Sequence, residues 1–139
     1  MVAVRSAFFL LLAILLTVPF GVLVSLAAVL PMPVRYRIIA VWRVGFMALC
    51  RYVLGIRYQV IGRENIPAEP SVVLAKHQSA WETVGLQEIF PPLVFVLKKE
   101  LLRVPFFGWG LAALKMISID RAAAKDALKQ VFDQGRDRL

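Results

Sequence analysis

A long uncharged segment near the N-terminus places the strongest constraint on this chain. Residues 6–34 contain no charged side chain, and the stretch 8–30 could cross a ~30 Å hydrocarbon core, which takes about 20 helical residues. A cleaved signal peptide has a shorter apolar core, about 7–15 residues, followed by small residues. Here the run ends in the bulky sequence LPMP, so we expect it to stay in a membrane. Pro19 and Gly21 leave two forms open, a spanning helix with a kink or a re-entrant hairpin.

Composition and charge agree with a membrane location. The chain is 60% hydrophobic with a mean hydropathy of +0.72, against ~45–50% apolar residues in ordinary soluble domains. Its formal charge is +8, and residues 1–63 contain arginines but no acidic residue. Cations beside an apolar segment suit anionic lipid head groups better than nucleic acid, which we do not expect as a partner. Arg35 and Arg37 come directly after the run and only Arg5 precedes it, which predicts a cytoplasmic location for the rest of the chain, as at a bacterial inner membrane.

Residues 36–54 have the pattern of an amphipathic helix. Four apolar side chains recur at helical spacing, and they are Trp42, Phe46, Leu49 and Val53. The arginines of this segment fall on the opposite side, which favours a helix lying in the membrane interface. Packing against a soluble domain is the alternative. We therefore predict a membrane anchor over residues 1–54 and a second domain over residues 55–139. The single cysteine, Cys50, cannot form a disulfide within the chain and is expected to be a buried apolar residue.

The second part begins with strand-like segments. Residues 56–61 alternate and are rich in Ile, Tyr and Val, and residues 71–75 form a β-branched run after a polar turn. The latter leads into His77 and Glu82, the candidate catalytic pair. Side chains five positions apart on one helix point about 140° apart. The two can therefore meet only if His77 precedes a helix whose first turn contains Glu82, at the carboxyl end of a strand, where α/β sheets hold their sites.

The chemistry of this pair has two interpretations. A neutral imidazole at His77, the only histidine, could take a proton from an attacking alcohol while the Glu82 carboxylate holds its tautomer. Alternatively, Ser79 and Glu82 form a capping box, in which Glu82 only bonds the backbone and His77 is an ordinary turn residue. The sequence pattern alone leaves both interpretations open.

Two motifs resemble those of the glycerol-phosphate and lysophosphatidic acid acyltransferases, and the resemblance extends over the whole chain. Residues 76–82 read KHQSAWE, similar to the family's Asn-His-Gln-Ser-x-Trp-Asp, with Lys replacing Asn and Glu replacing Asp. Residues 95–101 (FVLKKEL), 104–108 (VPFFG) and 117–121 (ISIDR) resemble its next motif in content and order. The resemblance implies an α/β fold in which N-terminal membrane helices precede a partial acyltransferase-like αβ domain. It also implies catalytic roles for His77 and Glu82.

The same resemblance implies further site residues. Gln78, Ser79 and Trp81 would belong to the substrate site. Lys98 and Arg121 become candidates for attracting an anionic head group or acyl donor, for which cations are chemically suited.

The reaction implied is transfer of a fatty acyl group from acyl-CoA or acyl carrier protein to lysophosphatidic acid in the membrane. No metal or other cofactor is expected. Another lysophospholipid or an amino-acid lipid is an alternative acceptor, and a non-catalytic membrane module is an alternative function. The family's later Phe-Pro-Glu-Gly-Thr-Arg motif has no match, so we expect an N-terminal fragment that is inactive alone.

Overall fold

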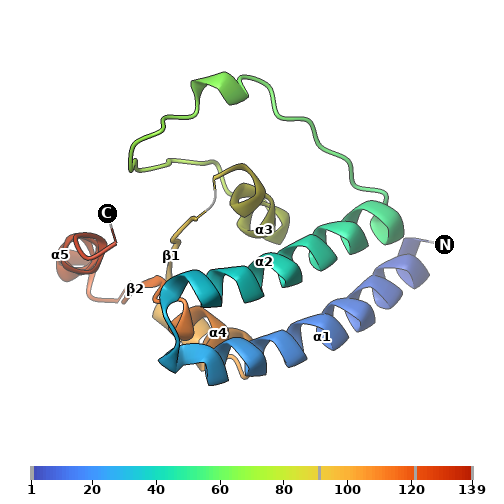
Figure 1. Ribbon diagram of the computed structural model, residues 1–139, viewed down its shortest axis with the longest axis horizontal. Helices are drawn as coiled ribbons and strands as arrows, with labels where there is room; N and C mark the ends of the chain where they lie inside the picture. Colours follow the sequence, from blue (N-terminus) through green and yellow to red (C-terminus); the bar gives the residue numbers. More distant parts are fainter. Residues whose placement is uncertain (1, 91, 121, 139) are drawn as a thin grey trace.

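The structure is a computed structural model that describes residues 2–90, 92–120 and 122–138, apart from the side chains of residues 124 and 125. It is mostly helical, with one small parallel sheet (Figure 1). The α-helices and strands are α1 Val2–Leu26, α2 Met32–Leu49, α3 Ala80–Ile89, β1 Val96–Lys98, α4 Phe107–Ala113, β2 Ile117–Ile119 and α5 Ala124–Gly135. Short 3-10 turns lie at η1 Ala27–Val29, η3 Arg63–Asn65 and η4 Lys99–Arg103, and a π-helical turn, η2 Cys50–Leu54, comes after α2.

The apolar N-terminal segment folds as the first arm of a helical hairpin. Helix α1 continues through Pro19, and the chain turns after η1, with Pro31 at the N-cap of α2. Helices α1 and α2 lie side by side (Figure 1). In the described part of the chain, Val2–Val29 is the one helix long and apolar enough to cross a membrane, judged by length and composition. Residues 6–34 are therefore largely helical, but the bend comes near Pro31 and not at Pro19 or Gly21.

The apolar face of α2 packs on α1. Trp42 is buried and donates its indole N–H to the Thr17 hydroxyl over 3.2 Å. Phe46 packs edge-on against Phe9, with ring centroids 5.6 Å apart. Trp42 and Phe46 therefore pack on α1, and the placement of this helix in the membrane interface stays a prediction. Cys50 is buried, as expected.

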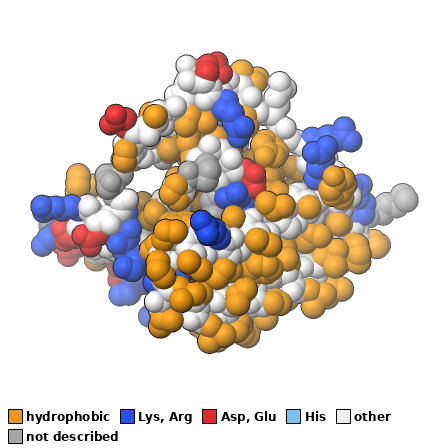
Figure 2. Space-filling view, viewed as in Figure 1, with side chains coloured by type: hydrophobic (Ala, Val, Ile, Leu, Met, Phe, Trp, Pro, Cys, Tyr) orange, Lys and Arg blue, Asp and Glu red, His pale blue; other side chains and the backbone are white. Residues whose placement is uncertain are grey.

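One buried core joins the hairpin to the rest of the chain. Its members come from α1, α2, α3, α4 and the segment between α4 and β2, and they are Val24, Ile39, Trp42, Val84, Ala113, Leu114 and Met116. Figure 2 shows the outer surface of the hairpin, where hydrophobic side chains dominate the lower part of the view. Apolar residues of α1 therefore serve both as core and as exposed surface.

The sheet has two strands in the described residues, and both lie in segments that resemble the family's second motif. Strands β1 and β2 pair in parallel, with Val96 opposite Ile117, and η4 and α4 connect them. Residues 56–61 and 71–75 are not strands in the structure, so those two predictions are wrong. Leu74 is 94% exposed and Ile61 87% exposed. A strand needs a neighbouring backbone to satisfy its N–H and C=O groups. These segments instead belong to the long connection between α2 and α3, seen as the arc at the top of Figure 1.

Helices α1 and α4 pack closely at two glycines, Gly21 of α1 and Gly110 of α4. A Cβ added at Gly21 would lie 2.5 Å from the carbonyl oxygen of Phe106, whereas one at Gly110 would lie 3.3 Å from Cγ1 of Val24. Phe106 itself has φ 63°, an unfavourable value for a bulky side chain. The backbone at Phe106 therefore fits α1 only because position 21 has no side chain.

This contact leads to a prediction about stability. Gly21→Ala should lower the free energy of unfolding by about 1–3 kcal/mol, since overpacking against backbone is not easily relieved. Gly110→Ala is the matched control and should cost less, because the Val24 side chain can shift. Thermal unfolding of both variants in detergent micelles would measure the difference. Equal stability of Gly21→Ala and the unsubstituted protein would contradict the close packing of α1 on α4.

Candidate active site

The candidate site lies at the start of α3. Ser79 has extended backbone angles, and its hydroxyl accepts a hydrogen bond from the Trp81 N–H over 3.3 Å. The Glu82 carboxylate returns to accept the Ser79 N–H over 2.7 Å, which completes a capping box. This is the helix start predicted from the sequence, and it fixes the position of the Glu82 side chain.

His77 lies in the turn before this helix and contacts Glu82. Its Nδ1 atom is 3.0 Å from Oε2 of Glu82. The same oxygen accepts the Gln78 N–H over 3.0 Å. The His77 side chain is 68% exposed and that of Glu82 is 23% exposed, so the imidazole is open to the outside while the carboxylate is partly covered. The predicted turn-then-helix arrangement is confirmed, although the segment before the turn is not a strand.

Electrostatics at Glu82 determine which nitrogen of His77 carries hydrogen. The hydrogen bond from the Ser79 N–H is the largest cause of a lowered pKa at Glu82. Desolvation by burial opposes it, and bonds from the Gln78 N–H, the Ser79 hydroxyl and His77 lower the pKa further. A lowered pKa keeps this carboxylate ionised at neutral pH, when it can only accept hydrogen bonds. Nδ1 of neutral His77 must therefore donate to it, which leaves the lone pair on Nε2 free to accept a proton.

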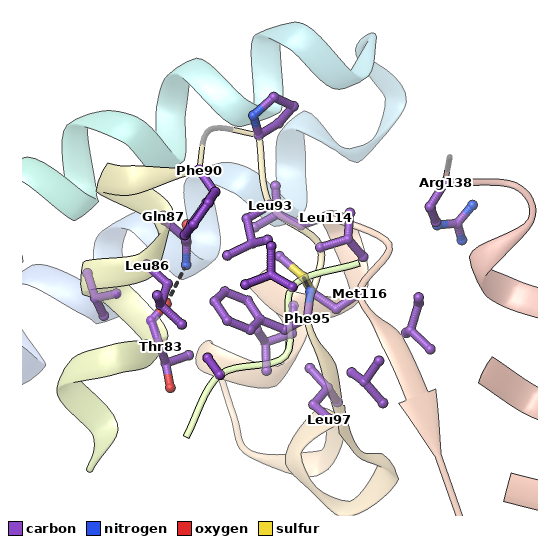
Figure 3. A pocket seen from close by; sticks show the side chains of 18 of the residues that line it. Thr83, Leu86, Gln87, Phe90, Leu93, Phe95, Leu97, Leu114, Met116 and Arg138 are labelled. Atoms are coloured by element: carbon purple, nitrogen blue, oxygen red, sulfur yellow. Dashed lines mark hydrogen bonds between the residues drawn. The ribbon is translucent and has the colours of Figure 1, made fainter. Parts of the chain in front are cut away.

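The pair borders a large open hollow of about 2250 Å³. His77, Glu82 and Lys98 line it together with apolar side chains from several elements. Figure 3 shows the apolar wall, whose labelled members include Leu86, Phe90, Leu93, Phe95, Leu97, Leu114 and Met116. The hollow thus combines a polar edge with an apolar interior, as expected for a ligand with a polar head and an apolar tail. Sequence reasoning missed this wall, because it is assembled from segments far apart in the chain.

The remaining predicted site residues lie in different surroundings from one another. Gln78 is exposed, and Ser79 caps α3. The Trp81 ring packs against Tyr58, with ring centroids 5.0 Å apart. The Trp81 indole N–H is buried without a hydrogen-bond partner in the described part of the chain. The structure therefore gives Ser79 and Trp81 packing and capping contacts beside the pair. Arg121 lies outside the described residues.

A second ion pair holds the other end of α3. The Arg43 guanidinium donates from Nε to Glu88 Oε1 over 2.8 Å and from Nη1 to the Gln87 carbonyl over 3.0 Å. The helical pattern of the sequence predicts Arg43 on the polar face of an interfacial helix, but its side chain instead joins α2 to α3. The helix that carries Glu82 is thus capped at its start and clamped near its end. Among the described residues, no group of three or more His, Cys, Asp or Glu side chains could hold a metal ion.

Comparison with known proteins identifies the class to which this fold and site belong. Residues 57–137 match the family described as Acyltransferase, and the match includes the turn of His77 and both strands. The chain therefore belongs to the acyltransferase family.

Three individual members of this family are similar to the chain. The chain is 50% identical to a 1-acyl-sn-glycerol-3-phosphate acyltransferase of Pseudomonas aeruginosa over 99% of its own length and 54% of the relative's. It is 34% identical to the Saccharomyces cerevisiae enzyme of the same name, over 60% of this chain and 28% of that one. A Danio rerio lysocardiolipin acyltransferase 1 is 33% identical over 87% of this chain and 35% of its own. The chain thus spans about half the length, or less, of these relatives, and no solved structure matches it.

Proposed function

We propose that this protein acts in transfer of a fatty acyl group from an acyl thioester to the free hydroxyl of lysophosphatidic acid, giving phosphatidic acid. The single observation that carries the proposal is the contact between His77 Nδ1 and Glu82 Oε2, at 3.0 Å, beside an apolar hollow. The 50% identity to a bacterial protein named for an acyltransferase of this acceptor supports the choice of substrate.

In the proposed mechanism His77 is the general base. Its Nε2 takes the proton of the acceptor hydroxyl as the hydroxyl oxygen attacks the thioester carbonyl. Glu82 holds the tautomer and stabilises the imidazolium that forms. The tetrahedral intermediate then expels the thiolate, which takes the proton back from the imidazolium. The products are an ester and a free thiol, and no covalent enzyme intermediate forms.

The other groups of the hollow would position the substrates. Lys98 is exposed at the end of β1 and lines the same hollow as His77, which suits an ammonium group that attracts a phosphate. The apolar wall beyond it would hold an acyl chain, since burying each CH₂ group gains about 0.8 kcal/mol. We also propose that the exposed apolar surface of α1 holds the protein on the cytoplasmic side of a membrane, where both lipids reside.

Acceptor competition would test the proposed function. The purified full protein in mixed lipid micelles should esterify lysophosphatidic acid at least ~10-fold faster than lysophosphatidylcholine, because only the former presents a phosphomonoester dianion to the cations of the site. Monolysocardiolipin is included because one relative is named for lysocardiolipin. Acyl-CoA and acyl carrier protein thioesters are each tried as donors. A rate for either other lysolipid that equals the rate for lysophosphatidic acid would overturn the proposed acceptor.

A further inference from the structure

Residues 104–114 form a second, shorter uncharged segment, VPFFGWGLAAL, which includes α4. It begins after Arg103 and ends before Lys115, and both cations are exposed. Val104 is 42% exposed and Trp109 47% exposed, so apolar side chains of this segment face outward. A short uncharged segment with exposed aromatic and apolar side chains and flanking cations is typical of elements that lie in a membrane interface.

Residues 104–114 pack against α1, so they share the surroundings of that helix. The Phe106 backbone lies at Gly21, and Gly110 lies at Val24. Farther toward the N-terminus of α1, an apolar groove of about 360 Å³ separates residues such as Leu10 and Ile14 from the 105–107 segment. The segment thus contacts the C-terminal part of α1 and faces its middle part across the groove. If α1 is immersed in lipid, the segment beside it cannot lie in bulk water.

Most backbone N–H groups at the irregular start of the segment are paired within the protein. The Val104 N–H donates to the Leu101 carbonyl, and the Phe107 N–H to the Pro105 carbonyl. The Gly108 N–H donates to the Val104 carbonyl and the Gly110 N–H to the Phe106 carbonyl. Pro105 has no N–H to satisfy. Irregular backbone at membrane depth is tolerated only when its polar groups are paired or covered in this way.

We propose that residues 104–114 dip into the same lipid leaflet as the part of α1 they contact, with Arg103 and Lys115 at the level of the anionic head groups. The segment is too short to cross a membrane, which takes about 20 helical residues. It also leaves β1 through η4 and returns to β2 of the same sheet, so it must enter and leave on one side. The inference depends on the proposed membrane attachment of α1, and it identifies a second lipid-contacting element that belongs to the catalytic part of the chain.

Site-directed spin labelling tests this proposal. Single cysteines replace Trp109 in α4, Leu15 in α1 and Leu128 in α5, all of them exposed apolar positions. Cys50 is buried, and the unsubstituted protein measures its background labelling. The full protein is reconstituted in vesicles of phosphatidylcholine and phosphatidylglycerol. Collisions of each label with oxygen, which concentrates in lipid, are compared with collisions with a water-soluble nickel chelate.

The three positions separate the possible outcomes. We expect oxygen collisions to exceed nickel collisions several-fold at positions 15 and 109, and the reverse at position 128. A lipid signal at 15 together with a water signal at 109 would overturn the inference and leave the anchor intact. Water signals at both would overturn the membrane attachment as well. Protection from both reagents at 109, with spin–spin broadening, would indicate a second copy of the chain on this surface and would also overturn the inference.

Discussion

Replacement of His77 by alanine should lower the rate of acyl transfer by about 10²–10⁴-fold, the range typical of general acid–base catalysis. His77 is exposed in a turn and makes its one side-chain hydrogen bond to Glu82 among the described residues, so its loss should leave the core intact. Initial rates with saturating acyl thioester and lysophosphatidic acid would measure the change. The effect should be on kcat, because the proton is transferred in the transition state and not in the bound ground state.

Two controls make the His77 result specific. Arg63→Ala alters an exposed residue of the same connection, in η3, and should leave the rate within a few-fold of the unsubstituted protein. Membrane retention and thermal unfolding of His77→Ala should match those of the unsubstituted protein. A fully folded His77→Ala variant that keeps its rate within a few-fold would eliminate the general-base mechanism.

The second large effect is expected at Glu82. Glu82→Gln removes the negative charge that stabilises the imidazolium, although its amide oxygen can still accept from Nδ1, so we expect a loss of about 10²-fold or more. Glu82→Asp keeps the charge on a shorter arm, and we expect a much milder loss. The ratio of kcat between these two variants is the measurement of interest.

The capping role of Glu82 requires a separate control. Ser79→Ala removes the cap hydroxyl of α3 but leaves the carboxylate beside His77, and loss of such a cap costs about 1 kcal/mol of stability. If Glu82 only caps the helix, Ser79→Ala and Glu82→Gln should lower kcat equally. A much larger loss for Glu82→Gln at similar stability would support the proposed orienting role.

Local signals explain which parts of the fold can be predicted from the sequence. The cap at Ser79, the helix after it and the two paired strands are predictable, because each depends on residues within one turn or one short run. The burial of the Cys50 thiol can be inferred from its apolar neighbours. The contact of His77 with Glu82 is predictable for the same reason, since the two residues are only five positions apart.

The failures share a dependence on distant partners. The β-branched run 71–75 has the composition of a strand, but in the structure no neighbouring strand pairs with it in the described residues. The pattern around Trp42 does not indicate that Thr17, twenty-five positions away, accepts the indole N–H. The sequence around Arg43 likewise gives no sign of its ion pair, because its partner, Glu88, lies 45 positions later in the chain.

The glycine contact between α1 and α4 also has an evolutionary consequence. A helix that served only to hold a protein on a membrane could exchange one apolar residue for another with little loss of stability. Position 21 does not have that freedom, because the Phe106 carbonyl occupies the space that any larger residue would need. A substitution at position 21 of α1 therefore requires a compensating change in the backbone around Phe106. An unrelated membrane helix in place of α1 would supply membrane attachment, but the core would lose Val24 and the Phe106 backbone would lose its contact with Gly21.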